Sequence, residues 1–246
     1  MRDLRDYQDK YLDNNPYEKY QVKYRREPIL NFIDQHKPKQ ILEIGCGEDS
    51  LFNYVANFER FVVVEPGDVF VAKATQAKGK HSLADKIQIV QEPFEGSNDR
   101  VKDFDFVICS GLLHELTNQR QFMDQLFSLS NHETIVHVSV PNANSFHREL
   151  AVKSGLIDSV HQKSDFQVKF QQHNVFSMKQ LEDLAASVGF EVIEKATFSL
   201  KPFTHIQMQR LIDDKIIDDR IVDALANMTY LLPEMGSEMY VNLKKK

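Results

Sequence analysis

The sequence predicts an α/β protein built on a seven-stranded, mostly parallel sheet with helices on both faces. From residue 40 onward, short β-branched runs alternate with segments of helical periodicity, which is typical of βαβ units. The first five runs are almost continuously apolar, as expected for strands buried on both faces. This arrangement is Rossmann-like. We expect the strands at residues 40–44, 61–65, 87–91, 104–109, 134–140, 190–198 and 239–243.

Helical periodicity between the strands predicts the crossover helices. The last of them begins after Ser177, a favourable N-cap residue, and ends at Gly189, a favourable C-cap residue. We expect the helices at residues 49–58, 69–78, 118–130 and 177–188.

Two segments fall outside this alternation. Residues 204–232 carry apolar side chains at helical spacing, which predicts an inserted pair of helices before the last strand. Such a pair either packs as a layer on the sheet or forms a substrate lid or a dimer surface. The polar, Tyr- and Arg-rich residues 1–26 predict an arm or helix that wraps a single domain at 27–246.

Composition and charge restrict the class of protein. A chain of 246 residues with 42% apolar residues can bury one large core. Its net charge of -6 argues against nucleic acid as a partner. Because the N-terminus has no apolar signal region and no run of 18 apolar residues occurs, we expect a cytoplasmic protein without membrane contact. Cys46 and Cys109 lie beside or within apolar strand patterns, which favours free thiols over a disulfide or metal site.

The segment ILEIGCGEDS predicts a ligand-binding loop. An apolar strand runs into Gly45 and Gly47, where the missing Cβ atoms allow backbone N–H groups to approach a ligand. A dinucleotide fingerprint needs a third glycine where this chain has Ser50, which argues against nicotinamide or flavin. Glu65 ends the second strand, where a carboxylate can accept ribose hydroxyl protons. Glu43 suits a cationic ligand or, alternatively, a local capping role.

The run Glu43-Ile-Gly45-Cys-Gly47, then Glu65 and FDFVICSGLLHEL, resembles the class I S-adenosylmethionine-dependent methyltransferase superfamily over roughly residues 25–243. The resemblance implies that Gly45 and Gly47 pass under the methionine part of S-adenosyl-L-methionine. It implies that Glu43 anchors that part and that Glu65 binds the ribose. It also implies an antiparallel last strand inserted beside the fifth.

The same resemblance implies further cofactor contacts. Glu92 and Phe94 stand where the family lines the adenine, although the family more often has Asp and a small residue there. Ser110 and Gly111 follow the fourth strand and would face the methionine end. Three residues of the N-terminal arm are expected either to close over the cofactor, with the arginine at its carboxylate, or to form a solvated helix face: Tyr20, Tyr24 and Arg25.

Three histidines are candidates for the catalytic chemistry. His114 lies just beyond the fourth strand, and its ordinary pKa suits proton transfer from a hydroxyl acceptor. Its alternative role is packing, or capping a helix with Glu115. His147 lies on the same rim after the fifth strand. His173 matches a segment of bacterial small-molecule methyltransferases in which a histidine faces the acceptor.

Polar residues near the same rim are candidates for acceptor binding. VPNANSFHREL supplies Asn142, Asn144 and Arg148, which either bind substrate or belong to a helix cap and a solvated helix. KPFTHIQMQR supplies His205, with Lys201 and Arg210, as donors for a phosphate, carboxylate or sugar, or as surface charge.

The sequence therefore predicts a methyltransferase with S-adenosyl-L-methionine as cofactor and a small-molecule polar substrate. A sugar or a nucleotide-linked or surface-polysaccharide precursor is the favoured acceptor, and the histidines favour O-methylation over N-methylation. The protein is expected to be a monomer or homodimer. The alternatives are a catalytically silent S-adenosylmethionine-binding subunit and an NAD(P)-dependent oxidoreductase.

Overall fold

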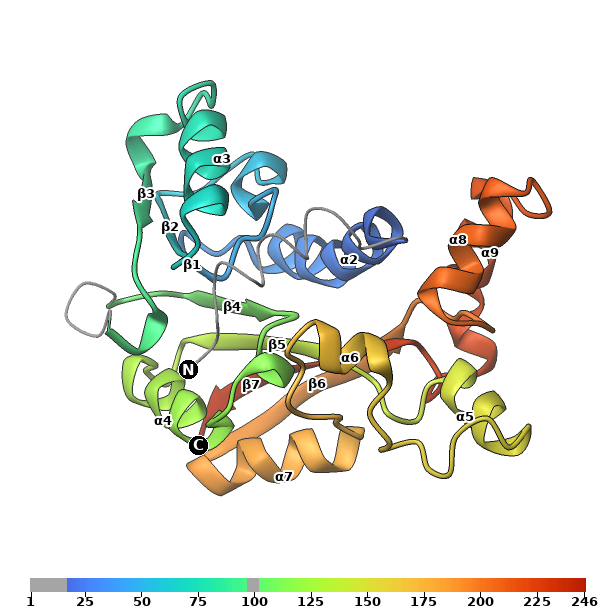
Figure 1. The fold of residues 1–246 in the computed structure, drawn as a ribbon. Coiled ribbons are helices and arrows are strands. Elements are labelled where there is room, and N and C mark those ends of the chain that lie inside the picture. Colours follow the sequence, from blue (N-terminus) through green and yellow to red (C-terminus); the bar gives the residue numbers. More distant parts are fainter. Residues whose placement is uncertain (1–16, 97–101) are drawn as a thin grey trace.

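A seven-stranded sheet forms the centre of the computed structural model, which describes residues 17–96 and 102–246. The strand order is β3-β2-β1-β4-β5-β7-β6 (Figure 1). β1 to β5 pair in parallel, whereas β7 lies antiparallel between β5 and β6, as predicted. The strands are β1 (Gln40–Ile44), β2 (Arg60–Val64), β3 (Ile87–Val90), β4 (Phe106–Ser110), β5 (Ile135–Pro141), β6 (Phe190–Phe198) and β7 (Glu238–Lys245).

Alternating strand residues supply a hydrophobic core on each face of the sheet. Leu42 and Val62 belong to the core that packs against α4 and α7. Ile41 and Phe61 belong to the core on the other face, with α2 and α3. The helices on both faces confirm the predicted fold class. The longer helices are α2 (Glu18–His36), α3 (Asp68–Lys78), α4 (Gln119–Leu129), α5 (Phe146–Lys153), α7 (Met178–Val188), α8 (His205–Asp213) and α9 (Asp219–Asn227).

The short elements lie between these helices and strands. They are α6 (Asp165–Lys169) and the 3₁₀ turns η1 (Leu51–Tyr54), η2 (Ala84–Lys86), η3 (Phe94–Gly96), η4 (Leu113–Glu115) and η5 (Met228–Leu231). Among the described residues, no helix combines the length and apolar character needed to span a membrane.

The predicted helix at 49–58 is wrong. Only the single turn η1 forms, and the backbone is extended again at Val55. Phe52 and Phe58 are both buried against Phe61 of β2, at ring-centroid distances of 5.9 and 5.4 Å. The segment therefore follows the aromatic core instead of continuing a helix.

The inserted helices α8 and α9 pack on α2 and on Phe198 at the end of β6, and of the two alternatives for this segment a layer on a face of the sheet is not found. Met208, Val222 and Ala226 form a separate apolar cluster with tyrosines of the N-terminal segment. The hydroxyls of Tyr20 and Tyr24 donate hydrogen bonds to Asp219 and Asp223 of α9. These tyrosines therefore hold α9 and do not close over a cofactor.

The N-terminal arm is only partly described. Helix α2 runs through the boundary expected at residue 26, so the end of the predicted arm and the start of the domain are one helix. Residues 1–16 of that arm lie outside the described residues.

A buried polar network holds β7 in place. Nδ1 of His137 lies 2.8 Å from Oδ1 of Asn242, its register partner on β7. The Asn242 amide donates to Glu194 of β6 at 2.7 Å, so its oxygen faces the imidazole and Nδ1 carries the proton. Burial lowers the pKa of His137 to about 4.

This pKa predicts acid destabilisation. Unfolded histidine has a pKa near 6.5, so between pH 6.5 and 4 the unfolded state binds a proton that folded His137 excludes. We expect this group alone to remove about 2 kcal/mol from the free energy of unfolding at pH 5 relative to pH 7.5. In urea unfolding at both pH values, His137→Gln should show a smaller pH-dependent loss than the parent. The exposed control His132→Gln should not; equal pH dependence in all three proteins would contradict the role of His137.

Candidate active site

A large cavity lies at the carboxyl ends of the parallel strands. The last residues of four strands line it: Ile44, Val64, Ser110 and Pro141. Open α/β sheets bind ligands at this edge, where the loops after the strands meet. The cavity volume of about 1460 Å³ exceeds the roughly 300–1,000 Å³ of a typical single-ligand pocket. It therefore has room for a cofactor and a second small molecule.

The glycine loop and the end of β2 meet at one carboxylate. Gly45 and Gly47 have positive φ angles of 78° and 55°, which turn the chain sharply after β1. Glu65, only 6% exposed, accepts the backbone N–H of Cys46 at 3.1 Å and that of Gly67 at 2.7 Å. All of these residues line the cavity. The two sequence elements predicted to form one ligand site therefore converge on one hollow.

Glu43 holds the other end of the glycine loop. Its carboxylate accepts the backbone N–H of Leu51 at 3.1 Å and the hydroxyl of Ser50. Burial raises its pKa to about 7, against the opposing effects of these hydrogen bonds and of Arg26. The local capping role, one of the two sequence-based interpretations, is thus present, and the side chain also lines the cavity.

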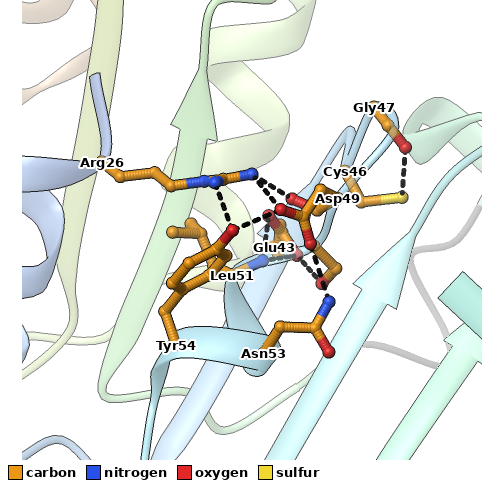
Figure 2. A network of polar contacts seen from close by, with 9 residues as sticks. Arg26, Glu43, Cys46, Gly47, Asp49, Leu51, Asn53 and Tyr54 are labelled. Atoms are coloured by element: carbon orange, nitrogen blue, oxygen red, sulfur yellow. Dashed lines mark hydrogen bonds and ion pairs between the residues drawn. The ribbon is translucent and has the colours of Figure 1, made fainter. Parts of the chain in front are cut away.

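A polar network that the sequence analysis missed connects α2 to this loop (Figure 2). One nitrogen of the Arg26 guanidinium donates to the backbone oxygen of Asp49 at 2.8 Å and to its carboxylate at 2.9 Å. Another donates to the Tyr54 hydroxyl at 2.7 Å, and Arg26 lies over the Tyr54 ring. The partners lie 23 and 28 residues from Arg26 in the chain, so no local sequence pattern identifies them.

The rim after β4 is built around Gly111. Its φ is 67°, and a Cβ at this position would lie 3.1 Å from Nη1 of Arg25. The guanidinium of Arg25 makes two hydrogen bonds to the Glu238 carboxylate, both 2.7 Å long. Arg25 lines the cavity, but this pair binds it to β7, which argues against the expectation that it reaches the cofactor's carboxylate. Ser110 shares a 2.9 Å hydrogen bond with Ser139.

The two residues expected at the adenine lie differently. Phe94 is buried, lines the cavity and packs on Phe122 with ring centroids 5.2 Å apart. Glu92 is half-buried and is not among the residues that line the cavity. The structure therefore supports an apolar contact at this place and not the predicted hydrogen-bonding partner.

The histidines divide into two groups. His114, His147 and His205 line the cavity. His173 is exposed and outside the lining, so its expected position facing the acceptor is not found. Its backbone N–H instead donates to the carbonyl oxygen of His114 at 2.9 Å and holds the η4 turn. Nε2 of His114 lies 3.9 Å from the carboxylate of Glu115, a cavity residue that the sequence analysis treated only as a helix cap.

The VPNANSFHREL residues mainly stabilise the fold around the cavity. The Asn142 amide donates to the carbonyl oxygens of Glu234 and Gly236, each at 2.9 Å. Its own oxygen accepts the N–H of Asn144, which is exposed and outside the lining. These contacts argue against the substrate-binding role expected for both asparagines.

Two arginines are likewise occupied elsewhere. Arg148 lines the cavity, but its guanidinium donates to the carbonyl oxygens of Val160 and Gln162. Arg210 is exposed and paired with Asp214 at 3.5 Å, so of its two expected roles the structure favours surface charge over acceptor binding.

A family model described as a methyltransferase domain matches residues 17–195. The chain belongs to this methyltransferase family. Its methyl donor is therefore S-adenosylmethionine, and the oxidoreductase alternative is set aside. No curated protein sequence matches this methyltransferase significantly.

Solved structures similar to this methyltransferase share its fold at low identity. The N-methyltransferase NodS from Bradyrhizobium japonicum WM9, in complex with S-adenosyl-l-homocysteine, has 12% identity and a TM-score of 0.56 over 96% of this chain and 90% of that one. The O-methyltransferase NcsB1 from neocarzinostatin biosynthesis has 12% identity and a TM-score of 0.52 over 84% and 48%. The [4+2]-cyclase SpnF has 12% identity and a TM-score of 0.59 over 90% and 80%. At these identities the likeness concerns the fold alone.

The residues of the methyltransferase fit this donor. Glu65 places a buried carboxylate, a group that accepts hydrogen bonds from hydroxyls, on the cavity wall at the end of β2. The glycine turn brings backbone close to the cavity without a Cβ, and Phe94 supplies an apolar face. When bound, the cofactor supplies an electrophilic methyl group.

The Arg26 network yields a prediction about stability. Arg26→Met should lower the free energy of unfolding by about 2 kcal/mol, because it removes charge-assisted hydrogen bonds between half-buried groups. Lys73→Met, which breaks the more exposed Lys73–Glu48 pair, should cost less than about 1 kcal/mol. Urea unfolding measures both; a larger loss for Lys73→Met would refute the assignment of Arg26 as the residue that fixes the loop.

Proposed function

We propose that this methyltransferase transfers a methyl group to an oxygen of a small polar acceptor that shares the cavity with the donor. The observation that carries the proposal is the convergence of Glu65 and the glycine loop on a cavity too large for one ligand. A sugar or a nucleotide-linked precursor of surface polysaccharide is the favoured acceptor class.

In this proposal each donor contact has a physical role. Glu65 binds the ribose hydroxyls, while Gly45 and Gly47 let the backbone lie against the methionine part. Phe94 covers the adenine. Glu43 acts through the loop that it caps, and Ser110 with Gly111 bounds the methionine end.

His114 is the general base in the proposal. It lies three residues after Gly111, lines the cavity and is 4% exposed, so a hydroxyl bound there exchanges protons with the imidazole and not with bulk water. Glu115 stands close enough to orient the ring or to stabilise its protonated form. A positioned base contributes typically 10²- to 10⁴-fold in rate, and alignment of acceptor and donor contributes on the order of 7–11 kcal/mol.

The histidines that line the cavity favour oxygen over nitrogen as the methylated atom. A hydroxyl must lose its proton as it attacks, whereas a neutral amine attacks without a strong base. Proteins with this fold include both an N- and an O-methyltransferase, so the preference rests on the side chains of this chain.

The ribose assignment predicts the effect of Glu65→Gln. The amide nitrogen of the new glutamine is a donor and would face one of the two backbone N–H donors, and the negative charge of the carboxylate would be lost. We expect the affinity for S-adenosylhomocysteine, measured by calorimetry, to fall at least about tenfold. Glu59→Gln, at the opposite end of the same strand and exposed, is the matched control and should bind as the parent does. Unchanged binding by Glu65→Gln would refute the donor site.

The base assignment predicts the effect of His114→Asn. A panel of small alcohols, sugars and amines, assayed for release of S-adenosylhomocysteine, identifies an acceptor. With a hydroxyl acceptor, His114→Asn should lower kcat about 10²-fold or more and remove the acid limb of the pH–rate profile. Its affinity for S-adenosylhomocysteine should stay unchanged. His173→Asn is the control; equal losses in both variants would exclude His114 as the base.

A second candidate function is cofactor binding without methyl transfer. The observation that favours it is the [4+2]-cyclase SpnF, which shares the fold but is named for other chemistry. In that case the chain would bind S-adenosylhomocysteine. It would not convert S-adenosylmethionine to S-adenosylhomocysteine with any acceptor of the panel. The substitution His114→Asn would leave the affinity for S-adenosylhomocysteine unchanged.

A further inference from the structure

A buried lysine lies on the cavity wall after β6. Lys201 is 1% exposed and lines the cavity. Within residues 17–96 and 102–246 its ammonium group forms no hydrogen bond or ion pair, and the Tyr17 ring lies 5.9 Å from it. Burying an ammonium group without an anion is costly. A methionine of similar volume would fill the same space without that cost, so stability does not account for the lysine.

The two carboxylates whose charges act on Lys201 both interact with Arg25. Glu238 of β7 and Glu18 of α2 attract its charge. Glu238, however, receives the two 2.7 Å hydrogen bonds from Arg25, and Glu18 lies 3.6 Å from the same guanidinium. The cavity is therefore the direction from which an anion can reach Lys201.

Two histidines of other elements face the same place. His147 of α5 and His205 of α8 line the cavity, and the pKa of each is lowered first by burial and next by the charge of Lys201. Burial also lowers the pKa of Lys201 to about 7. Arg148 adds positive charge near His147, and Arg25 adds it near His205.

Hydrogen-bonding capacity is available at His147. Nδ1 of His147 is buried and has no hydrogen-bond partner in the described part of the chain. His205 stacks on Tyr17, the ring that also faces Lys201, at a centroid distance of 6.2 Å. Lys201 and His205 thus lie against the same Tyr17 ring, and the charge of Lys201 disfavours protonation of His147 and of His205.

We propose that Lys201, His147 and His205 form an oxyanion subsite that binds a carboxylate or phosphate group of the acceptor. The inference rests on the proposed function and narrows its acceptor to anionic molecules. An arriving anion stabilises the protonated forms of the three groups, so binding takes up protons from solution. In this proposal His147 binds the anion, and His114 remains the general base.

The test uses sulfate and acetate, which do not titrate near neutral pH, as probes of the full-length protein saturated with S-adenosylhomocysteine. Sulfate stands for phosphate and acetate for carboxylate. Calorimetry at pH 8 in two buffers of different ionisation enthalpy gives the affinity and the proton uptake. Lys201→Met should bind the preferred probe at least tenfold more weakly and lose most of the uptake. Lys195→Met, a change at an exposed lysine of β6, should behave as the parent.

Each outcome decides the proposal. Equal affinity in the parent and Lys201→Met, or binding without proton uptake, overturns it. Loss of kcat in Lys201→Met with unchanged anion affinity also overturns it, because the lysine then acts on the reaction itself. If Lys201→Met fails to fold, His147→Asn replaces it, with the same expected weakening. Failure of the methyltransferase proposal is a separate result, because the anion affinity needs no methyl transfer and donor binding is measured with Glu65→Gln.

Discussion

The site depends on one carboxylate that fixes two loops at once. Glu65 accepts a backbone N–H from the loop after β1 and another from the loop after β2. These strands are adjacent and parallel, so their loops emerge at the same edge of the sheet. The N–H groups of Cys46 and Gly67 lie beyond the paired ends of the strands, and the buried carboxylate accepts both. Glu65 also lines the cavity, so the group that holds the two loops belongs to the cavity wall.

The surrounding polar groups support this arrangement from outside. Glu43 caps the next turn of the loop, and Arg26 fixes that turn to α2. On the far side Gly111 leaves space for the Arg25–Glu238 pair, which joins α2 to the inserted strand β7. Arg26 is therefore paired with Asp49 and Arg25 with Glu238, whereas Lys201 forms no ion pair within the described residues.

The sequence predicted the features that depend on local patterns. The strands follow from runs of apolar residues, and α7 follows from its caps at Ser177 and Gly189. The pairing of the glycine loop with Glu65 follows from a fixed spacing in parallel α/β folds. The helix expected at 49–58 failed because burial of Phe52 and Phe58 overrides helical periodicity there.

Features that depend on distant partners were beyond the sequence. Arg25, Asn142 and Arg148 are polar residues near the rim, as expected, but their hydrogen bonds go to residues 12 to 213 positions away. Periodicity does not show whether such a side chain faces a ligand or its own backbone. Lys201 appeared in the sequence as one of several basic residues, and only its burial without a partner separates it from Arg210.

Helix α2 has a consequence for how the two substrates influence each other. Over seven residues it contacts α9 through Tyr20 and Tyr24, β7 through Arg25, and the donor loop through Arg26. A ligand that displaces this helix therefore changes both halves of the cavity. If a ligand in one half did so, it would alter affinity in the other half, and the reverse effect would have the same factor because energetic coupling between two binding sites is reciprocal. Helix α2 would then couple donor and acceptor binding in addition to the direct contact that methyl transfer requires.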